Sequence, residues 1–258
     1  WVLLSVIFHS SFVLHTYHWR ESSLIVEFFT EKEGRVSAVA KGARRATSNL
    51  RGLLIPFNRI LIRYSKKGEL RSLMSAEWDE RGEKKLAGEQ LFTGFYINEL
   101  ILKLVQKNDP FKVLFSAYES TLKSLALLPE LQEVHLRRFE FAMLKEIGVF
   151  PDFSEYIISG KNHLYLTPEH GVVSEIDIHN RGYTIGYDYF PIGSDLLKIL
   201  KMLTFDFNQW VKIFQNKKYW MRLKSLLRFL LNGQLNSVEL KSRRIMREIN
   251  EFSKGIKK

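Results

Sequence analysis

The spacing of the apolar residues changes near Gly82, and this change constrains the fold more than any other feature of the chain. Between residues 12 and 80, short runs rich in Val, Ile, Leu, Phe and Tyr alternate with turn residues, which is typical of β-strands. From residue 82 onward the apolar residues recur at the spacing of amphipathic helices. The sequence therefore predicts an α+β protein with one domain at residues 1–80 and a second at residues 81–258.

The first domain is predicted to be a small β-barrel or meander. Its strand-like runs are short, and turn signals such as Glu33-Gly34 and Pro56 separate them. About five strands of this length in roughly 70 residues suit a small closed sheet. Residues 65–69 connect the last two runs in the manner of a hairpin. The expected strands include Ser23–Phe29, Arg35–Ala40, Ile60–Tyr64 and Leu70–Ala76.

The second domain is predicted to consist of helices that flank an irregular insert. Pro110 suits the first turn of a helix, Pro129 ends that helix, and Gly148 is a C-cap signal for the next one. Residues 149–193 are rich in Gly and Pro, which predicts an irregular insert with a small hairpin. The expected helices, with Ser194 and Ser237 as N-caps, are 86–105, Phe111–Leu128, Glu130–Ile147, Ser194–Leu203, Phe207–Leu231 and Ser237–Phe252.

The net charge of +11 is concentrated in the C-terminal quarter of the chain. Residues 198–258 contain 15 Lys and Arg against 4 Asp and Glu, whereas residues 1–197 contain 24 of each kind. Such a surplus favours nucleic acid, an anionic membrane surface or an acidic protein as the partner. The apolar start at residues 1–10 is far shorter than the roughly 20 residues that span a bilayer, so we expect no membrane partner.

The sequence lacks the usual catalytic motifs. A phosphate-binding loop, an H-E-x-x-H motif and a G-x-S-x-G motif are all missing. The absence of cysteine excludes disulfides, thiolate-ligated zinc and a cysteine nucleophile, and it agrees with a reducing cytoplasm. His163, His170 and His179 have spacings that match no standard metal site. We therefore expect no enzyme, no catalytic residue, no metal and no cofactor.

A basic loop at Lys41–Arg51 lies between two of the expected strands. It holds four basic residues and no acid, and Gly42 with small polar residues keeps it loop-like. A flexible cationic loop suits a phosphate backbone, which needs charge and reach rather than a reactive group. A solvated basic loop without a ligand is the alternative interpretation. The barrel residues that we predict to bind DNA are Arg35, Lys41, Arg44, Arg45 and Arg51.

Aromatic and basic residues also alternate, both in the barrel, as at Trp19-Arg20, and in the C-terminal helices. Aromatic rings stack on unpaired bases while cations neutralise phosphates, so this mixture suits a single strand. In Phe207–Leu231 the apolar residues fall at helical spacing, which favours the alternative that these aromatics form a core and the lysines face water. The second-rank candidates for DNA binding are Lys217, Lys218, Arg222, Lys241, Arg243 and Arg244.

The third predicted helix carries a possible peptide-binding face. Arg138, Phe141 and Lys145 are three and seven residues apart and share one side of the helix. An apolar slot edged by arginines suits an acidic peptide that ends in a carboxylate. Arginines that cap or bridge neighbouring helices are the alternative. The candidate peptide-binding residues are Arg137, Arg138, Phe141 and Leu144.

Short motifs along the chain carry a family resemblance. They include Phe12–His15, Glu21–Leu24, Gly34–Val36, Val39–Arg44, Leu50–Phe57, Ser75–Glu77, Gly94–Leu100, Leu136–Glu140 and Leu240–Arg243. This ordered set, which covers about residues 11–250, resembles the bacterial recombination-repair protein RecO family. Some members carry four zinc-binding cysteines in the region that matches Phe150–Pro191, and this chain has none there, so zinc is not carried over. The leader Trp1–Ser10 also departs from the family pattern.

The resemblance implies an N-terminal OB-fold β-barrel followed by an α-helical domain. It implies binding of single- and double-stranded DNA and ATP-independent annealing of complementary strands, as part of the RecFOR pathway. It also implies partnership with RecR and with the acidic C-terminal tail of single-stranded-DNA-binding protein, and help in loading RecA onto coated strands. The expected location is the cytoplasm, in association with the nucleoid.

Two other functions remain as alternatives. In the first, the chain is a protein-interaction adaptor that docks acidic partners, and DNA contact is incidental. In the second, it is a nuclease or another hydrolase, which requires clustered carboxylates and a metal dependence. The sequence carries neither of those two signals.

Overall fold

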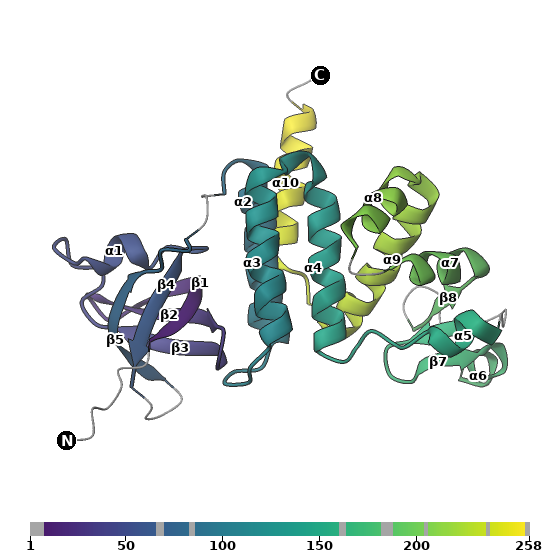
Figure 1. The fold of residues 1–258 in the computed structure, drawn as a ribbon, viewed down its shortest axis with the longest axis horizontal. Helices are drawn as coiled ribbons and strands as arrows, with labels where there is room; N and C mark the ends of the chain where they lie inside the picture. Colours follow the sequence, from purple (N-terminus) through teal and green to yellow (C-terminus); the bar gives the residue numbers. More distant parts are fainter. Residues whose placement is uncertain are drawn as a thin grey trace. The chain divides into compact units, whose positions relative to one another are not determined.

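The computed structural model describes residues 8–65, 70–82, 86–159, 164–181, 188–203, 206–235 and 238–255 (Figure 1). The chain forms two compact units. The first contains the described residues up to Gln132 together with those from Leu240 onward, and the second is Glu133–Glu239. The predicted change from strands to helices is present, and the compact units divide the chain at positions other than residues 80 and 81.

Five strands close into a barrel in the first unit, which confirms the predicted OB-type fold (Figure 1). The strand order around the barrel is β1-β2-β3-β5-β4, and β1 completes the circle by pairing with β4. The β3–β5 pair is parallel, whereas the other pairs are antiparallel. A short helix, α1 (Leu50–Leu53), lies between β3 and β4. The strands are β1 (His9–Trp19), β2 (Ser23–Thr30), β3 (Gly34–Ala40), β4 (Arg59–Tyr64) and β5 (Arg71–Trp78).

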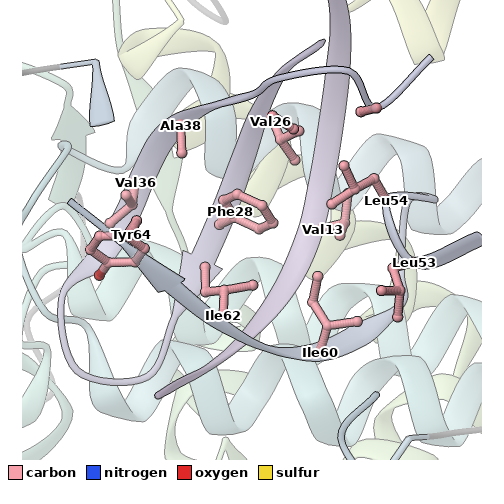
Figure 2. Close-up of a cluster of buried hydrophobic side chains, with 12 residues drawn as sticks. Val13, Val26, Phe28, Val36, Ala38, Leu53, Leu54, Ile60, Ile62 and Tyr64 are labelled. Carbon is pink, nitrogen blue, oxygen red and sulfur yellow. The ribbon is translucent and has the colours of Figure 1, made fainter. Parts of the chain in front are cut away.

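Apolar side chains from every second position of the strands fill the barrel. Figure 2 shows Val26, Phe28, Ile60 and Ile62 pointing toward one another from different strands. Leu53, at the end of α1, belongs to the same cluster. Because successive side chains on a strand point to opposite faces, the remaining residues of these strands lie on the outside of the barrel.

The part of β1 that pairs with β2, residues 11–19, contains one residue more than the paired residues 23–30 of β2. Val13 pairs with Phe28, whereas the next pair is His15 with Glu27. Leu14 is therefore a β-bulge, an extra residue that the ladder leaves unpaired. The extra residue exchanges the two faces of β1, so residues after Leu14 lie on the opposite side from the one that simple alternation assigns.

The bulge is held from the helical side of the first unit. The side-chain amide of Asn98 donates a hydrogen bond to the Leu14 carbonyl at 2.8 Å, and the Tyr118 hydroxyl donates to Asn98 Oδ1 at 2.6 Å. All three residues are buried. The Tyr118 ring also packs edge-on against Phe12 and Phe29 on the outer face of the barrel. The bulge and the docking of the helices on the barrel thus depend on the same contacts.

Among the described residues, three helices and a short 3-10 turn complete the first unit. The helix α2 packs against both α3 and α10 (Figure 1). The predicted helix Phe111–Leu128 is confirmed as α3, whereas the last helix begins at Lys241 rather than at Ser237, which lies outside the described residues. Its N-terminal amides, at Lys241 and Ser242, donate to the Glu99 carboxylate at 2.9 Å each. The elements are α2 (Glu89–Leu104), α3 (Lys112–Leu127), η1 (Pro129–Leu131) and α10 (Lys241–Gly255).

The second unit combines helices with a small sheet. The insert holds a three-stranded sheet of order β7-β6-β8 rather than a lone hairpin. Its strands are β6 (Leu164–Thr167), β7 (Gly171–Ser174) and β8 (Phe190–Ile192). The helices are α4 (Gln132–Glu146), α5 (Ser154–Ser159), α6 (Glu175–Arg181), α7 (Ser194–Met202), α8 (Phe207–Gln215) and α9 (Lys217–Gln234).

Two predicted helix boundaries in this unit are wrong. Ser194 is the first residue of α7, and the N-cap is Gly193, without a side-chain hydrogen bond. The single helix predicted for Phe207–Leu231 is divided at Asn216 into α8 and α9. The Asn216 side chain accepts a hydrogen bond from the Tyr219 amide at 3.1 Å, which is the N-cap interaction that starts a new helix.

A buried arginine on the barrel joins strands β1 and β4 to the end of β5 and to helix α3. Arg59 is only 3% exposed. Its Nε donates to Asp79 at 3.0 Å, and its guanidinium also pairs with Glu119 of α3. The Ser10 hydroxyl and the Arg81 guanidinium donate to the same Asp79 carboxylate, at 3.0 and 2.8 Å. The charge of Arg59 is therefore neutralised inside the unit and is not available to an external ligand.

Removal of the Arg59 side chain is expected to destabilise the first unit strongly. Arg59→Met removes the buried cation that pairs with both Asp79 and Glu119, and breaking a buried pair costs about 3–5 kcal/mol. Urea denaturation measures this loss directly. Arg51→Met, at an exposed position on α1, is the matched control and should change stability by no more than about 0.5 kcal/mol. Equal stability of the two variants would contradict the structural role of Arg59.

Stability is expected to fall in acid because of Asp79. Burial alone favours the neutral acid, but hydrogen bonds from Arg81, Ser10 and Arg59 outweigh it and hold the pKa of Asp79 well below its usual range. A depressed pKa stabilises the fold above the unfolded-state value of about 4, and this contribution is lost as the pH falls further.

Asp79→Asn should therefore be less stable than the parent at pH 7, and the difference should shrink below about pH 4. Urea midpoints at pH 7, 5 and 3.5 test this expectation. Asp109→Asn, at an exposed carboxyl of the same unit, serves as the control. A difference between Asp79→Asn and the parent that is independent of pH would assign the loss to packing instead of charge.

Candidate nucleic-acid interface

The basic loop leaves the barrel at the end of β3. Lys41, Arg44, Arg45 and Arg51 are all exposed. Among the residues that the structure describes, none of these four forms an ion pair with a carboxylate. Their charges are thus available to an anionic ligand, in contrast to that of Arg59.

Backbone contacts give this loop a defined shape. Ala43 is fully buried in the barrel core. The Arg44 amide donates to the Ser22 carbonyl at 2.9 Å, and the Arg44 guanidinium donates to the Glu21 carbonyl at 3.0 Å. Gly42 adopts a positive φ of 68°, which a side chain at that position would disfavour. The loop is therefore fastened to the turn between β1 and β2, and the two segments form one surface.

Arg35 lies apart from that surface. It is half-buried on β3, and its guanidinium donates to the Leu102 carbonyl near the end of α2. A partly buried cation bound to a carbonyl offers less to a phosphate than an exposed one does. We therefore place Arg35 below the four loop residues as a DNA contact.

The candidates on α9 belong to the second unit. Lys217 is exposed, and the Lys218 ammonium pairs with Asp195, which raises the pKa of Lys218. Arg222 is half-buried: it donates to the Pro191 carbonyl and lies 4.7 Å from the centre of the Phe190 ring. A cavity of about 500 Å³ lies beside these side chains, between the start of α7 and the face of α9.

The candidates on α10 belong to the first unit. Lys241 is exposed beside the Glu99 carboxylate that caps the helix. Arg243 donates to the Tyr96 hydroxyl at 2.8 Å, and Arg244 lies 3.7 Å from Glu248. The six second-rank candidates therefore divide between the two units, and several of them already contact other groups of the protein.

Burial distinguishes aromatic residues of the core from exposed ones, which the sequence alone could not do. Trp210 and Trp220 are 1% and 5% exposed, and the Trp220 indole donates to Glu133 at 2.7 Å. The core interpretation is therefore correct for these two C-terminal aromatics. In the barrel, by contrast, Tyr17 is 47% and Trp19 is 39% exposed.

The four peptide-binding candidates lie on α4, in the second unit. Arg137 pairs with the fully buried Glu140 at 2.6 Å, and Leu144 is itself fully buried. The sequence left open that these arginines cap or bridge neighbouring helices, whereas the Glu140 partner of Arg137 lies on the same helix, three residues on. Leu144 supports this surface from beneath and is not part of it.

Arg138 and Phe141 are half-buried on the side of α4 that contacts α8. The Arg138 guanidinium lies 5.1 Å from the centre of the Phe207 ring, and Phe141 packs edge-on against Phe150 and Trp210. Burial lowers the pKa of Arg138, and Asp206 partly offsets that effect. A cation that is poorly solvated gains more from a carboxylate than a fully hydrated one. Lys145, which is exposed, lies over the Phe141 ring at 5.6 Å.

No group of three or more His, Cys, Asp or Glu side chains within the described residues is placed to hold a metal ion. His163, one of the three histidines of the insert, lies outside these residues. In the part of the chain that the structure describes, no helix is long and apolar enough to cross a membrane.

Comparisons with known proteins assign the two halves of the chain to one family. The family model for the recombination protein O N terminal matches residues 8–80, and that for its C terminal matches residues 87–244. The chain is 37% identical to the DNA repair protein RecO of Aromatoleum aromaticum over 244 residues, which are 94% of this chain and 95% of the relative. It is also 37% identical to that of Azoarcus sp. over 247 residues, 94% of this chain and 96% of the relative.

Neutralisation of the basic loop is expected to weaken DNA binding together with its salt dependence. Each lost phosphate contact should reduce the slope of log affinity against log salt by about 0.9 for duplex and about 0.7 for a single strand. Lys41→Ala, Arg44→Ala and Arg45→Ala should each have this effect, and the triple variant should add them.

Fluorescence anisotropy of a labelled oligonucleotide between 50 and 200 mM salt measures the slope. Lys112→Ala removes an exposed charge from α3 of the same unit and controls for net charge alone. An equal loss in Lys112→Ala and in the loop variants would mean that the loop is not a binding site.

Proposed function

The chain belongs to the recombination protein O family, and we propose that it acts in DNA repair and homologous recombination by binding single- and double-stranded DNA. The observation that carries this proposal is the exposed basic loop beside the β1–β2 turn of an OB-type barrel. OB-type barrels bind oligonucleotides on the face of their second and third strands and on neighbouring loops. Here the basic loop directly follows β3.

Annealing of complementary strands is the activity that this chemistry supports. Two strands repel one another through their phosphates, and exposed cations reduce that repulsion. The loop side chains supply charge without a reactive group, so the bases remain able to pair. The sequence contains no ATP-binding loop motif. The proposed annealing is therefore independent of ATP, and we propose no catalytic step.

We place a partner-binding surface on α4, with Arg138 and Phe141 as its centre. The partner that fits is the acidic C-terminal tail of single-stranded-DNA-binding protein, because a partly desolvated cation beside an aromatic ring suits a terminal carboxylate. Arg137 contributes less, since Glu140 already neutralises it. Together with RecR, this contact would allow the protein to reach coated strands and help load RecA there, at the nucleoid in the cytoplasm.

Annealing of two complementary oligonucleotides without ATP tests the proposal, on bare strands and on strands coated with single-stranded-DNA-binding protein. The parent should accelerate annealing in both states. The triple variant of Lys41, Arg44 and Arg45 to Ala should lose acceleration in both states, because the strands themselves are no longer held. Arg138→Ala should lose it only on coated strands.

The variants separate the mediator from the adaptor. The DNA proposal fails if the parent accelerates annealing neither on bare strands nor on coated strands. If the triple variant then still binds the acidic tail peptide, the protein is an adaptor. Lys112→Ala is again the control for charge. Equal loss of both reactions in Arg138→Ala would place Arg138 in DNA binding or in folding, and thermal unfolding of the variant decides between these two.

A further inference from the structure

The bulge at Leu14 places two aromatic side chains on the outside of the barrel. Beyond the bulge, Thr16 pairs with the core residue Val26, so Thr16 faces the interior. Tyr17 and Trp19, which are two residues apart, consequently both lie on the outer face. Residues at this spacing on a strand are about 7 Å apart. We call Tyr17, Trp19 and their cross-strand neighbours Ile25 and Val39 the aromatic patch.

This patch lies beyond a part of the outer face that helix α3 covers. Before the bulge, the outer residues Phe12 and Phe29 pack against Phe115 of α3. Beyond it, Tyr17 and Trp19 are 47% and 39% exposed, and Ile25 and Val39 are partly exposed. Large exposed aromatic side chains that are grouped on one surface mark an interaction site.

The charges around the patch identify its occupant. Arg44 is bonded to the β1–β2 turn directly after Trp19, and Lys41 follows Ala40, the partner of Leu24 on β2. Glu27, a carboxylate on this face, accepts from Ser37 at 2.6 Å and lies 3.5 Å from Lys107, so it is compensated. The exposed Glu21 lies in the β1–β2 turn, where its carbonyl accepts from Arg44. The patch is thus bordered by exposed cations. This arrangement suits a ligand that has flat apolar rings joined by anionic groups.

We propose that the aromatic patch is a base-stacking platform for single-stranded nucleic acid, with Trp19 and Tyr17 as the stacking residues. The inference rests on the proposed DNA binding and assigns single-strand preference to this part of the site. Unpaired bases stack on exposed aromatic rings, and the basic loop holds the phosphates that link them. In a duplex the bases are stacked on one another, so a duplex uses the loop and not the patch.

The test compares the affinity of each variant for a single-stranded oligonucleotide and for the matched duplex. Trp19→Ala should lower single-strand affinity about 5- to 150-fold, the range of one base stacked on one aromatic ring. Tyr17→Ala should have a smaller effect of the same kind. Duplex affinity should stay within about twofold of the parent in both variants, because the loop cations remain.

Trp78→Ala is the matched control. Trp78 is 56% exposed on the same barrel. It pairs with Ile60, which pairs with Ser11 of β1, eight residues before Trp19. Its removal should leave both affinities unchanged. Trp19→Phe keeps an aromatic face and should retain most of the single-strand affinity, which separates stacking from a general loss of structure.

Each outcome decides the inference. A selective loss in Trp19→Ala, with Trp19→Phe close to the parent, supports it. Equal loss for both ligands, or an equal loss in Trp78→Ala, overturns it. If Trp19→Ala binds both ligands normally while the loop variants lose both, the platform is wrong and the proposed DNA binding stands. If the parent binds neither ligand, the proposed function itself fails, and the patch is then a docking surface for protein.

Discussion

A buried chain of hydrogen bonds, from Tyr118 through Asn98 to the Leu14 carbonyl, determines which side chains of β1 lie on the outside of the barrel. It holds Leu14, the residue that the β1–β2 ladder leaves unpaired between Val13 and His15. A bulge left without such a partner would expose a buried carbonyl to an apolar environment, which costs about 1–3 kcal/mol. With the partner in place, the strand changes faces in its middle. Its first half then packs on α3, and its second half is open beside the basic loop.

Much of this fold could be predicted from the sequence, because alternation and turn residues are local signals. The runs of β2, β3 and β4 were visible in this way, and so was α3 between Pro110 and Pro129. The bulge was not, since it depends on Asn98, 84 residues away. The division at Asn216 was missed for another reason. Apolar spacing continues across it, while a capping side chain, which any Asn can supply, sets the break.

The residues of the candidate site were harder to predict from the sequence than the fold, because their roles depend on contacts between distant residues. In the sequence, each of the residues Arg35, Arg59 and Lys41 simply contributes one positive charge. Only tertiary packing shows which of these charges is available to a ligand. Arg59 lies against Asp79 and Glu119, Arg35 on a carbonyl of α2, and Lys41 in water. Trp19 was identified beside Arg20 as a mixture of aromatic and basic residues. Tyr17 was not, because its outward direction follows from the bulge and not from its neighbours in the chain.

In the proposed annealing, the aromatic patch holds the bases and the basic loop holds the phosphates. A protein that holds bases too tightly prevents them from pairing. Stacking on an aromatic ring contributes about 1–3 kcal/mol per base, and a base-pair step in duplex DNA about 1.4 kcal/mol on average. These magnitudes are similar, so a complementary strand can displace a base from Trp19 or Tyr17 at little net cost. The loop cations favour both states, since they contact phosphates that persist in the duplex. A small aromatic platform beside a larger cationic one would therefore bind single strands and release them as pairs form, with no need for ATP.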